Sequence, residues 1–246
     1  MTSKPVQARE PLALLKTLLA LILVALCIWA AQWQFQRGID RQDRNDTIEA
    51  QLTLPTLDIT EIPSKDSSQM EEFEWRTINA TGTFKSDQQI LLKNRYFEGK
   101  YGYEVLTRFS LSDGRFVWVD RGWVKAGKDA RTAPVVTAVP KSEVSIVARV
   151  RLDKSLPVGA FFALPASGTG MISKLNAQTG SASEGFYLDL ISGSVSSLTP
   201  KAAAQVPELS DGPHLAYSFQ WIFFSGLIIS GRILIRRGQI LTRKEL

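Results

Sequence analysis

The residues best suited to chemistry gather around the only histidine of the chain, His214. Imidazole can bind a metal or transfer a proton near neutral pH, so its single occurrence in 246 residues needs an explanation. His214 stands directly before a long apolar run, "LAYSFQWIFFSG", which begins at Leu215. Any site built here therefore uses one imidazole and partners of other types.

The residues that follow His214 form a polar and aromatic face if the segment is helical. With about 100° between successive residues, His214, Ser218, Trp221 and Ser225 fall on one side, and Tyr217 lies at its edge. Polar groups inside a membrane segment are costly, and they usually face protein, a cavity or a ligand. A purely lipid-facing helix is therefore unfavourable here.

A neutral imidazole beside aromatic rings suits an iron porphyrin, since the nitrogen ligates the iron and the rings cover the macrocycle. This makes His214, Tyr217 and Trp221 candidate cofactor-binding residues, with His214 as ligand of a haem iron. Two other interpretations stay open on the residues alone. His214 can hydrogen-bond a neighbouring helix, and Tyr217 and Trp221 can anchor the segment at the membrane surface.

Two segments are long and apolar enough to cross a bilayer. Residues 17–36 and 215–231 contain no charged side chain, and a hydrocarbon core of about 30 Å needs roughly 20 helical residues. The sequence predicts transmembrane helices over 12–36 and 214–235, the second reaching its end if Arg232 extends to the headgroups. Gln32, Gln34 and Gln36 lie on the first at the depth of His214. Gly226 and Ser230, spaced four apart, predict close packing of the pair.

The positive charge of the chain is confined to its two ends. The net charge is +5, of which residues 1–16 carry +2 and residues 232–246 carry +4, so the middle sums to −1. A neutral middle offers no basic face for phosphates, which argues against nucleic-acid binding. Basic flanks at both outer ends instead predict that both termini are cytoplasmic and that the middle lies across the membrane.

These spans divide the chain into five parts. We expect a cytoplasmic tail (1–11), a transmembrane helix (12–36), an extracytoplasmic β-rich domain (37–213), a second transmembrane helix (214–235) and a basic cytoplasmic tail (236–246). The first span lacks a clear small-x-small cleavage site, so we interpret it as an uncleaved anchor. No Arg/Ser-rich presequence precedes it, which favours a bacterial plasma membrane.

The residue pattern in the middle of the chain predicts short strands separated by turns. The first helix should continue past the membrane until Pro55, and β-type runs begin at Trp75. We expect strands over 75–84, 88–97, 101–111, 115–124, 143–152 and 186–192, with a turn at "KSD" (85–87) and one short helix at 171–178. Short strands and tight turns predict a mainly antiparallel barrel or sandwich with a few short helices.

Several kinds of site are absent from residues 37–213, which contain neither histidine nor cysteine. This excludes a Ser-His-Asp triad, a Cys-His pair, and zinc or copper sites that need these ligands. "GWVKAGKD" (122–129) imitates a phosphate loop, but Asp129 stands where Ser or Thr should bind magnesium. A hydrolase built on paired carboxylates has no support in the sequence, although it stays a hypothesis.

Several short motifs, in order along nearly the whole chain, resemble the Surfeit locus protein 1 family. "WQFQR" (33–37) is similar to its W-Q-x-x-R, and "TGTF" (81–84), "GYEVLTRF" (102–109) and "GRFVWVDRGWV" (114–124) resemble its strands. Asp120 and Lys125 replace the family's usual Asn and Pro. The most specific match is the closing H-x-x-Y-x-x-Q-W, which begins at His214 and ends at Trp221.

The resemblance implies a membrane protein, not an enzyme, that helps to assemble haem–copper cytochrome c oxidase. It would handle haem a and aid its insertion into, or retention by, the haem-containing subunit. The family's proposed haem-ligand histidine corresponds to His214. The implied partners are that oxidase subunit, the lipid bilayer and haem a synthase. An assembly scaffold that binds no haem is the alternative, with His214 bonding another helix.

Overall fold

The computed structural model describes residues 11–64, 70–128, 132–152 and 170–241, and side chains as far as Arg237. It divides into two compact units, Met1–Asp46 with Glu208–Leu246 (the helical unit) and Thr47–Pro207 (the β unit). The expected tails, 1–11 and 236–246, fall almost entirely outside the described side chains, and so does the stretch 153–169.

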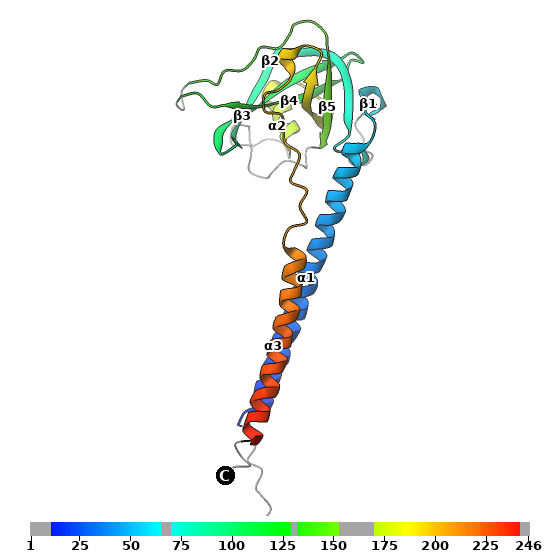
Figure 1. Cartoon of the computed structure of the whole chain (residues 1–246). Helices are drawn as coiled ribbons and strands as arrows, with labels where there is room; N and C mark the ends of the chain where they lie inside the picture. Colours follow the sequence, from blue (N-terminus) through cyan, green and yellow to red (C-terminus); the bar gives the residue numbers. More distant parts are fainter. Residues whose placement is uncertain (1–10, 65–69, 129–131, 153–169, 242–246) are drawn as a thin grey trace, which may run out of the picture. The chain divides into compact units, whose positions relative to one another are not determined.

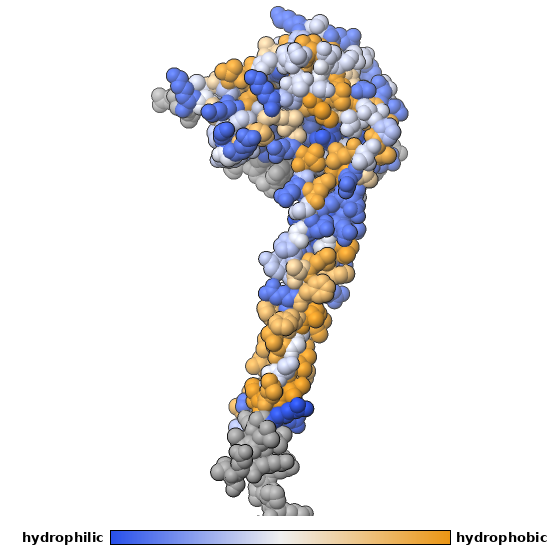
Figure 2. Space-filling view, in the orientation of Figure 1, coloured by the Kyte–Doolittle hydropathy of each residue, from blue (hydrophilic) through white to orange (hydrophobic). Residues whose placement is uncertain are grey.

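The helical unit contains α3 (His214–Leu241) and all but the last turns of α1 (Ala13–Thr53), and the two helices run antiparallel (Figure 1). Helix α1 continues past the apolar run and ends at Thr53, two residues before Pro55, as predicted. Both helices are long and apolar enough to span a membrane. Leu14 is 87% exposed and Phe219 77%, and Figure 2 shows such apolar surface along this unit. Surface of this kind needs an apolar surrounding.

α1 and α3 pack along a seam in which buried and half-buried residues recur at intervals of four and three. On α1 these are Ala13, Thr17, Ala20, Val24, Cys27, Ala31, Gln34 and Gly38, and on α3 they are His214, Ser218, Trp221, Ser225, Ile228 and Arg232. Arg41 and Asn45 continue the row on α1, but they donate to the carbonyl of Ser210, which precedes α3. This spacing keeps the contacts on one face of each helix, as in a coiled coil. The predicted common face of His214, Ser218, Trp221 and Ser225 is confirmed.

The seam corrects two expectations for α3. Gly226 and Ser230 are exposed, and a Cβ on Gly226 would meet no atom within 4 Å, so they do not form the packing face. Small residues on the other side of α3, Ser218 and Ser225, have that role because they lie in line with His214. Arg232 turns inward rather than to the headgroups, where its Nη2 donates to Thr17 Oγ1 at 2.9 Å.

The β unit is a closed barrel. Its strands are β1 (Leu57–Asp58), β2 (Thr77–Phe97), β3 (Lys100–Leu111), β4 (Phe116–Lys125), β5 (Val144–Leu152) and β6 (Phe186–Gly193). They are ordered β1-β2-β3-β4-β6-β5, and an additional β2–β5 pairing closes the ring (Figure 1). The pairings are antiparallel except β1–β2 and β4–β6. A barrel, not a sandwich, is therefore the architecture.

The described residues add one helix of nine residues, α2 (Met171–Thr179), and three 3₁₀ turns, Ile59–Glu61, Met70–Phe73 and Ser196–Leu198. Six predicted strand segments and the helix at 171–178 are present. The predicted turn at 85–87 is wrong, because β2 runs through it as one 21-residue strand. A bulge between Lys85 and Gln89 absorbs the polar residues without ending the pairing with β3.

Side chains on both faces of the barrel are buried. The interior takes Ile78, Phe109, Val119, Ala148 and Leu188, one from each strand of the ring and none of them exposed. On the outer face, α2 packs in a second cluster that also contains Leu106, Trp118 and Tyr187. Strand β4 is therefore apolar at successive positions instead of alternating, because its two faces join two cores.

Candidate functional site

His214 opens α3 opposite Gln34 of α1. Nδ1 of His214 lies 2.9 Å from Oε1 of Gln34, and both side chains are half-buried in the seam. Gly38, one turn further along α1, lets α3 begin close to α1, since a Cβ there would come within 3.0 Å of Leu215. The contact joins the motif "WQFQR" (33–37) at the end of the first apolar segment to the motif that begins at His214.

The hydrogen bond determines which imidazole nitrogen can bind a metal. An amide oxygen only accepts, so Nδ1 of His214 is the donor and carries the proton. The neutral ring then has its lone pair on Nε2, and a carbonyl-type acceptor on Nδ1 is the partner that metal-binding histidines usually have. His214 is thus oriented as a ligand would be.

Only one of the three glutamines of the first span lies in the seam. Gln34 faces α3, whereas Gln32 and Gln36 are exposed, and Nε2 of Gln36 donates to Asp40 at 2.9 Å. On a helix Gln32 and Gln36 each lie about 200° from Gln34 and only about 40° from each other, so both face away from the side that Gln34 occupies. The sequence predicted all three glutamines near the level of His214, but only the packing of the two helices identifies Gln34 as the partner of the histidine.

The two candidate aromatic residues occupy different positions. Trp221 is half-buried in the seam, two turns below His214, with its ring centroid 5.8 Å from that of Phe224. Tyr217 is 46% exposed and lies on the outer surface of α3. Between His214 and Trp221 in the seam, Ser218 Oγ donates to the carbonyl of Ala31 at 2.9 Å. The structure therefore places Trp221 and His214 in the same seam, two turns apart, and leaves Tyr217 outside it.

The ligand set fits a porphyrin better than a bare metal ion. Over the described residues, no group of three or more His, Cys, Asp or Glu side chains could hold a metal ion. A haem iron needs only one or two protein ligands because the macrocycle supplies four nitrogens. One oriented, half-buried imidazole one turn from the exposed ring of Tyr217 meets that requirement.

The two carboxylates that neighbouring strands pair in the described part of the β unit do not form an open acid–base site. Asp120 and Asp189 are paired in register on β4 and β6, and they are 4% and 2% exposed. Burial raises the pKa of both. Asp189 is bound by Arg151 at 2.7 Å, and Asp120 Oδ1 accepts the backbone N–H of Gly122 at 2.8 Å. These partners and this burial suit structural roles.

The segment Arg121-Gly122-Trp123 lies near the end of β4. Gly122 has φ +88°, and a Cβ on it would lie 2.3 Å from the carbonyl oxygen of Ala202, so only glycine fits. Trp123 is half-buried rather than in the core. Its ring covers Gly102, stacks against Phe97 at 5.5 Å and donates through Nε1 to the Arg95 carbonyl. Gly122 is therefore architectural, whereas Trp123 lies at a surface.

Comparison with known proteins identifies the family. A model of the SURF1 family matches residues 21–226, from within α1 to within α3. The chain belongs to the SURF1 family. This confirms the resemblance seen in the sequence, and it places the chain in a family known for oxidase assembly factors.

Individual SURF1-like proteins extend the match. An uncharacterized SURF1-like protein of Mycobacterium bovis is 32% identical over 239 residues, covering 92% of this chain and 85% of the relative. A SURF1-like protein of Rickettsia felis is 27% identical over 108 residues, covering 43% and 45%. One of Dictyostelium discoideum is 31% identical over 88 residues, covering 36% and 31%. The match to the mycobacterial relative therefore extends over most of the chain.

Proposed function

We propose that this chain binds haem a as cargo through His214, and aids its insertion into or retention by the haem-containing subunit of a haem–copper cytochrome c oxidase. The observation that carries the proposal is the bond from His214 Nδ1 to Gln34, which orients the ring and leaves Nε2 for iron. The chain acts as a carrier, not an enzyme.

The surroundings of His214 support a site from which cargo can be released. The imidazole is half-buried, so one side is held by α1 and another is open to an incoming ring. Tyr217 presents an exposed aromatic surface one turn away, and Trp221 supports the seam below. A single imidazole on a partly open surface binds more weakly than an enclosed pocket, which suits transfer.

The proposed setting is a bacterial plasma membrane, with both termini cytoplasmic and the β unit outside. The support is the basic charge at the outer end of each apolar segment, together with relatives in bacteria. The partners in this proposal are the lipid bilayer, the oxidase subunit that receives haem a, and haem a synthase as its source.

The test is haem retention by the purified full chain after co-expression with enzymes that make haem a. The wild-type protein should show a Soret band with near-stoichiometric haem. His214→Ala should lose most of this haem while still inserting into the membrane, because the apolar run from Leu215 is unchanged. His214→Met should keep partial binding with an altered potential, since a thioether can also ligate haem iron.

The scaffold alternative predicts a different outcome. If His214 serves only as a hydrogen-bond donor to Gln34, the wild-type protein purifies without haem, or His214→Ala keeps the wild-type Soret band. Oxidase activity in cells would then fall only through loss of the helix–helix contact. Either spectrum rejects the ligand assignment, and the scaffold hypothesis replaces it.

A further inference from the structure

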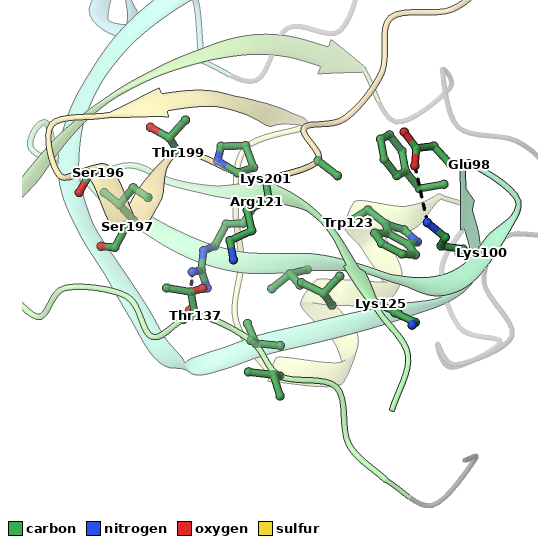
Figure 3. A pocket seen from close by; sticks show the side chains of 18 residues that line it. Glu98, Lys100, Arg121, Trp123, Lys125, Thr137, Ser196, Ser197, Thr199 and Lys201 are labelled. Carbon is green, nitrogen blue, oxygen red and sulfur yellow. Dashed lines mark hydrogen bonds and ion pairs between the residues drawn. The ribbon is translucent and has the colours of Figure 1, made fainter. Parts of the chain in front are cut away.

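The β unit contains a cavity of about 720 Å³ that the function proposed above does not use. It is bordered by the end of β4, by residues 135–137 and by residues 196–202 (Figure 3). Arg121 and Trp123 project into it from β4 on either side of Gly122. Its volume lies within the range of sites that hold small organic molecules, about 300–1,000 Å³.

Arg121 brings an uncompensated charge to this cavity. The residue is 9% exposed, and its guanidinium donates to Oε1 of Gln89 at 3.0 Å and to the carbonyl of Thr137 at 2.6 Å. Both acceptors are neutral, and Nε is buried without a hydrogen-bond partner. Within the described ranges no carboxylate pairs with Arg121. A buried cation left without an anion is costly, which points to a missing negative partner.

The rim of the cavity adds positive charge. Lys100, Lys125 and Lys201 line it, and the one carboxylate among the described lining residues, Glu98, lies 3.8 Å from Lys100. With Arg121, four cations face one anion. Such a concentration of one sign in a concave site attracts anions and raises their local concentration.

The walls between these charges are apolar. Trp123 stacks on Phe97 with 5.5 Å between ring centroids, and Val105, Val124 and Leu198 also line the cavity. An inorganic anion would leave this surface without a partner. The surface instead matches a molecule with an aromatic or aliphatic body attached to its charge.

We propose that this cavity binds a small amphipathic carboxylate, with the carboxylate on Arg121 and the apolar body against Trp123. An Arg guanidinium and a carboxylate form two parallel hydrogen bonds, so the donors of Arg121 not used by Gln89 and Thr137 favour this group over a neutral one. The proposal stands apart from haem handling, because it involves none of the residues of the helical unit.

The experiment uses the full chain in detergent with two matched probes, para-trifluoromethylbenzoate and its neutral amide, followed by fluorine NMR line broadening. The amide partitions into micelles at least as well, so any excess broadening of the benzoate reports the protein site. We expect saturable benzoate binding and at least about tenfold weaker binding in Arg121→Gln, the loss typical of one charge-assisted contact.

Two further variants complete the design. Lys201→Gln changes an exposed rim residue and should weaken benzoate binding about threefold even if Arg121→Gln proves unstable. Arg44→Gln removes an equal charge from an exposed position of α1 and should change nothing. Equal broadening of the two probes by the wild-type protein overturns the proposal. So does a loss in Arg44→Gln as large as in Lys201→Gln, which would indicate a general charge effect.

Discussion

Nη1 of Arg151 lies 2.7 Å from Oδ2 of Asp189, in an ion pair whose side chains are 8% and 2% exposed. The same guanidinium lies 3.7 Å from the ring centroid of Trp75, so a π face and a carboxylate balance the charge of one buried cation, although its Nε has no hydrogen-bond partner. The pair joins neighbouring strands β5 and β6 on the outer face of the barrel. Arg121 differs in this respect, because no carboxylate among the described residues pairs with it.

Asp189→Ala should destabilise the β unit by about 3–5 kcal/mol, because it leaves Arg151 buried without its partner. The double variant Arg151→Met with Asp189→Leu should recover most of that loss, since two apolar side chains need no pairing. Denaturant unfolding followed by the sheet signal in circular dichroism measures both. A double variant less stable than Asp189→Ala would contradict this account.

Asp120→Asn should stabilise the chain, and more at higher pH. Burial raises the pKa of Asp120 well above its usual range, and the nearby Glu104 and Asp189 raise it further. An acid with a raised folded-state pKa supports folding below its unfolded-state pKa, about 3.9, and loses that contribution as pH rises through the folded-state value. Asn never ionises, and its oxygen can still accept the Gly122 N–H.

Thermal unfolding at about pH 5 and about pH 8 tests this prediction. We expect Asp120→Asn to raise the melting temperature at the higher pH by at least about 2 °C, and by less at the lower pH. A gain that shrinks with rising pH would mean that Asp120 is stabilised as a carboxylate. The substitution also restores the Asn that usually stands at this position in the family's motif.

Gly122→Ala should lower stability by at least about 2 kcal/mol. The new Cβ would meet the Ala202 carbonyl oxygen at 2.3 Å, and a φ of +88° strains any L side chain. The backbone bond from Trp123 N–H to that same carbonyl, 2.8 Å long, would have to move as well. Gly114→Ala is the matched control, because Gly114 has a similar φ of +89° but no atom within 4 Å. Equal losses would assign the effect to φ alone.

The local sequence pattern predicted the helices and strands of this fold well, but it did not predict how the strands close into a ring. The run around Trp118 and Val119 predicts a strand, and it is one. Only the closed ring explains why Val119 is fully buried, and only the packing of α2 on the outer face explains why Trp118 is. The polar residues 85–87 read as a turn because the pairing that carries β2 through them comes from β3, about twenty residues later. Barrel and sandwich share one local pattern, so the β2–β5 pairing decided between them.

The candidate site shows the same division. Helical periodicity placed His214, Ser218 and Trp221 on one face, since that depends on one helix only. The pairing of His214 with Gln34 depends on how two helices 180 residues apart meet, and nothing in either segment determines that register. For the same reason Gly226 and Ser230 were predicted on the wrong face, because small residues alone do not say which side a partner covers.

Reporter fusions should confirm the proposed topology. A reporter active only in the cytoplasm should work when fused after Leu246. One active only outside should work when inserted at the exposed turn between Asp113 and Gly114 in the β unit. Reversed activities would place the β unit in the cytoplasm and remove the proposed site from the outer leaflet. Removing Arg236 and Arg237 should weaken the orientation, because basic residues after α3 are part of the signal.

Gln34 gives the most discriminating prediction, because it separates a ligand held in place from a hydrogen bond between helices. Gln34→Leu removes the acceptor on Nδ1 of His214, so the ring loses its orientation and its fixed tautomer. Haem affinity of the co-expressed protein should fall about 10–100-fold, the usual cost of losing such a partner. Gln34→Glu keeps an acceptor and places a negative charge beside the imidazole. The bound haem should then have a lower reduction potential.

The matched control is Gln32→Leu, since Gln32 has the same side chain on the same helix but is exposed. Titration of haem by Soret absorbance and redox titration of the bound haem provide two independent measurements. A purely structural role for Gln34 would leave the potential of any retained haem unchanged in Gln34→Glu. The ligand account requires the potential to move, because the acceptor on Nδ1 sets the electron density that Nε2 donates to iron. If neither the reduction potential nor the haem affinity changes in these variants, His214 is not the ligand of the iron.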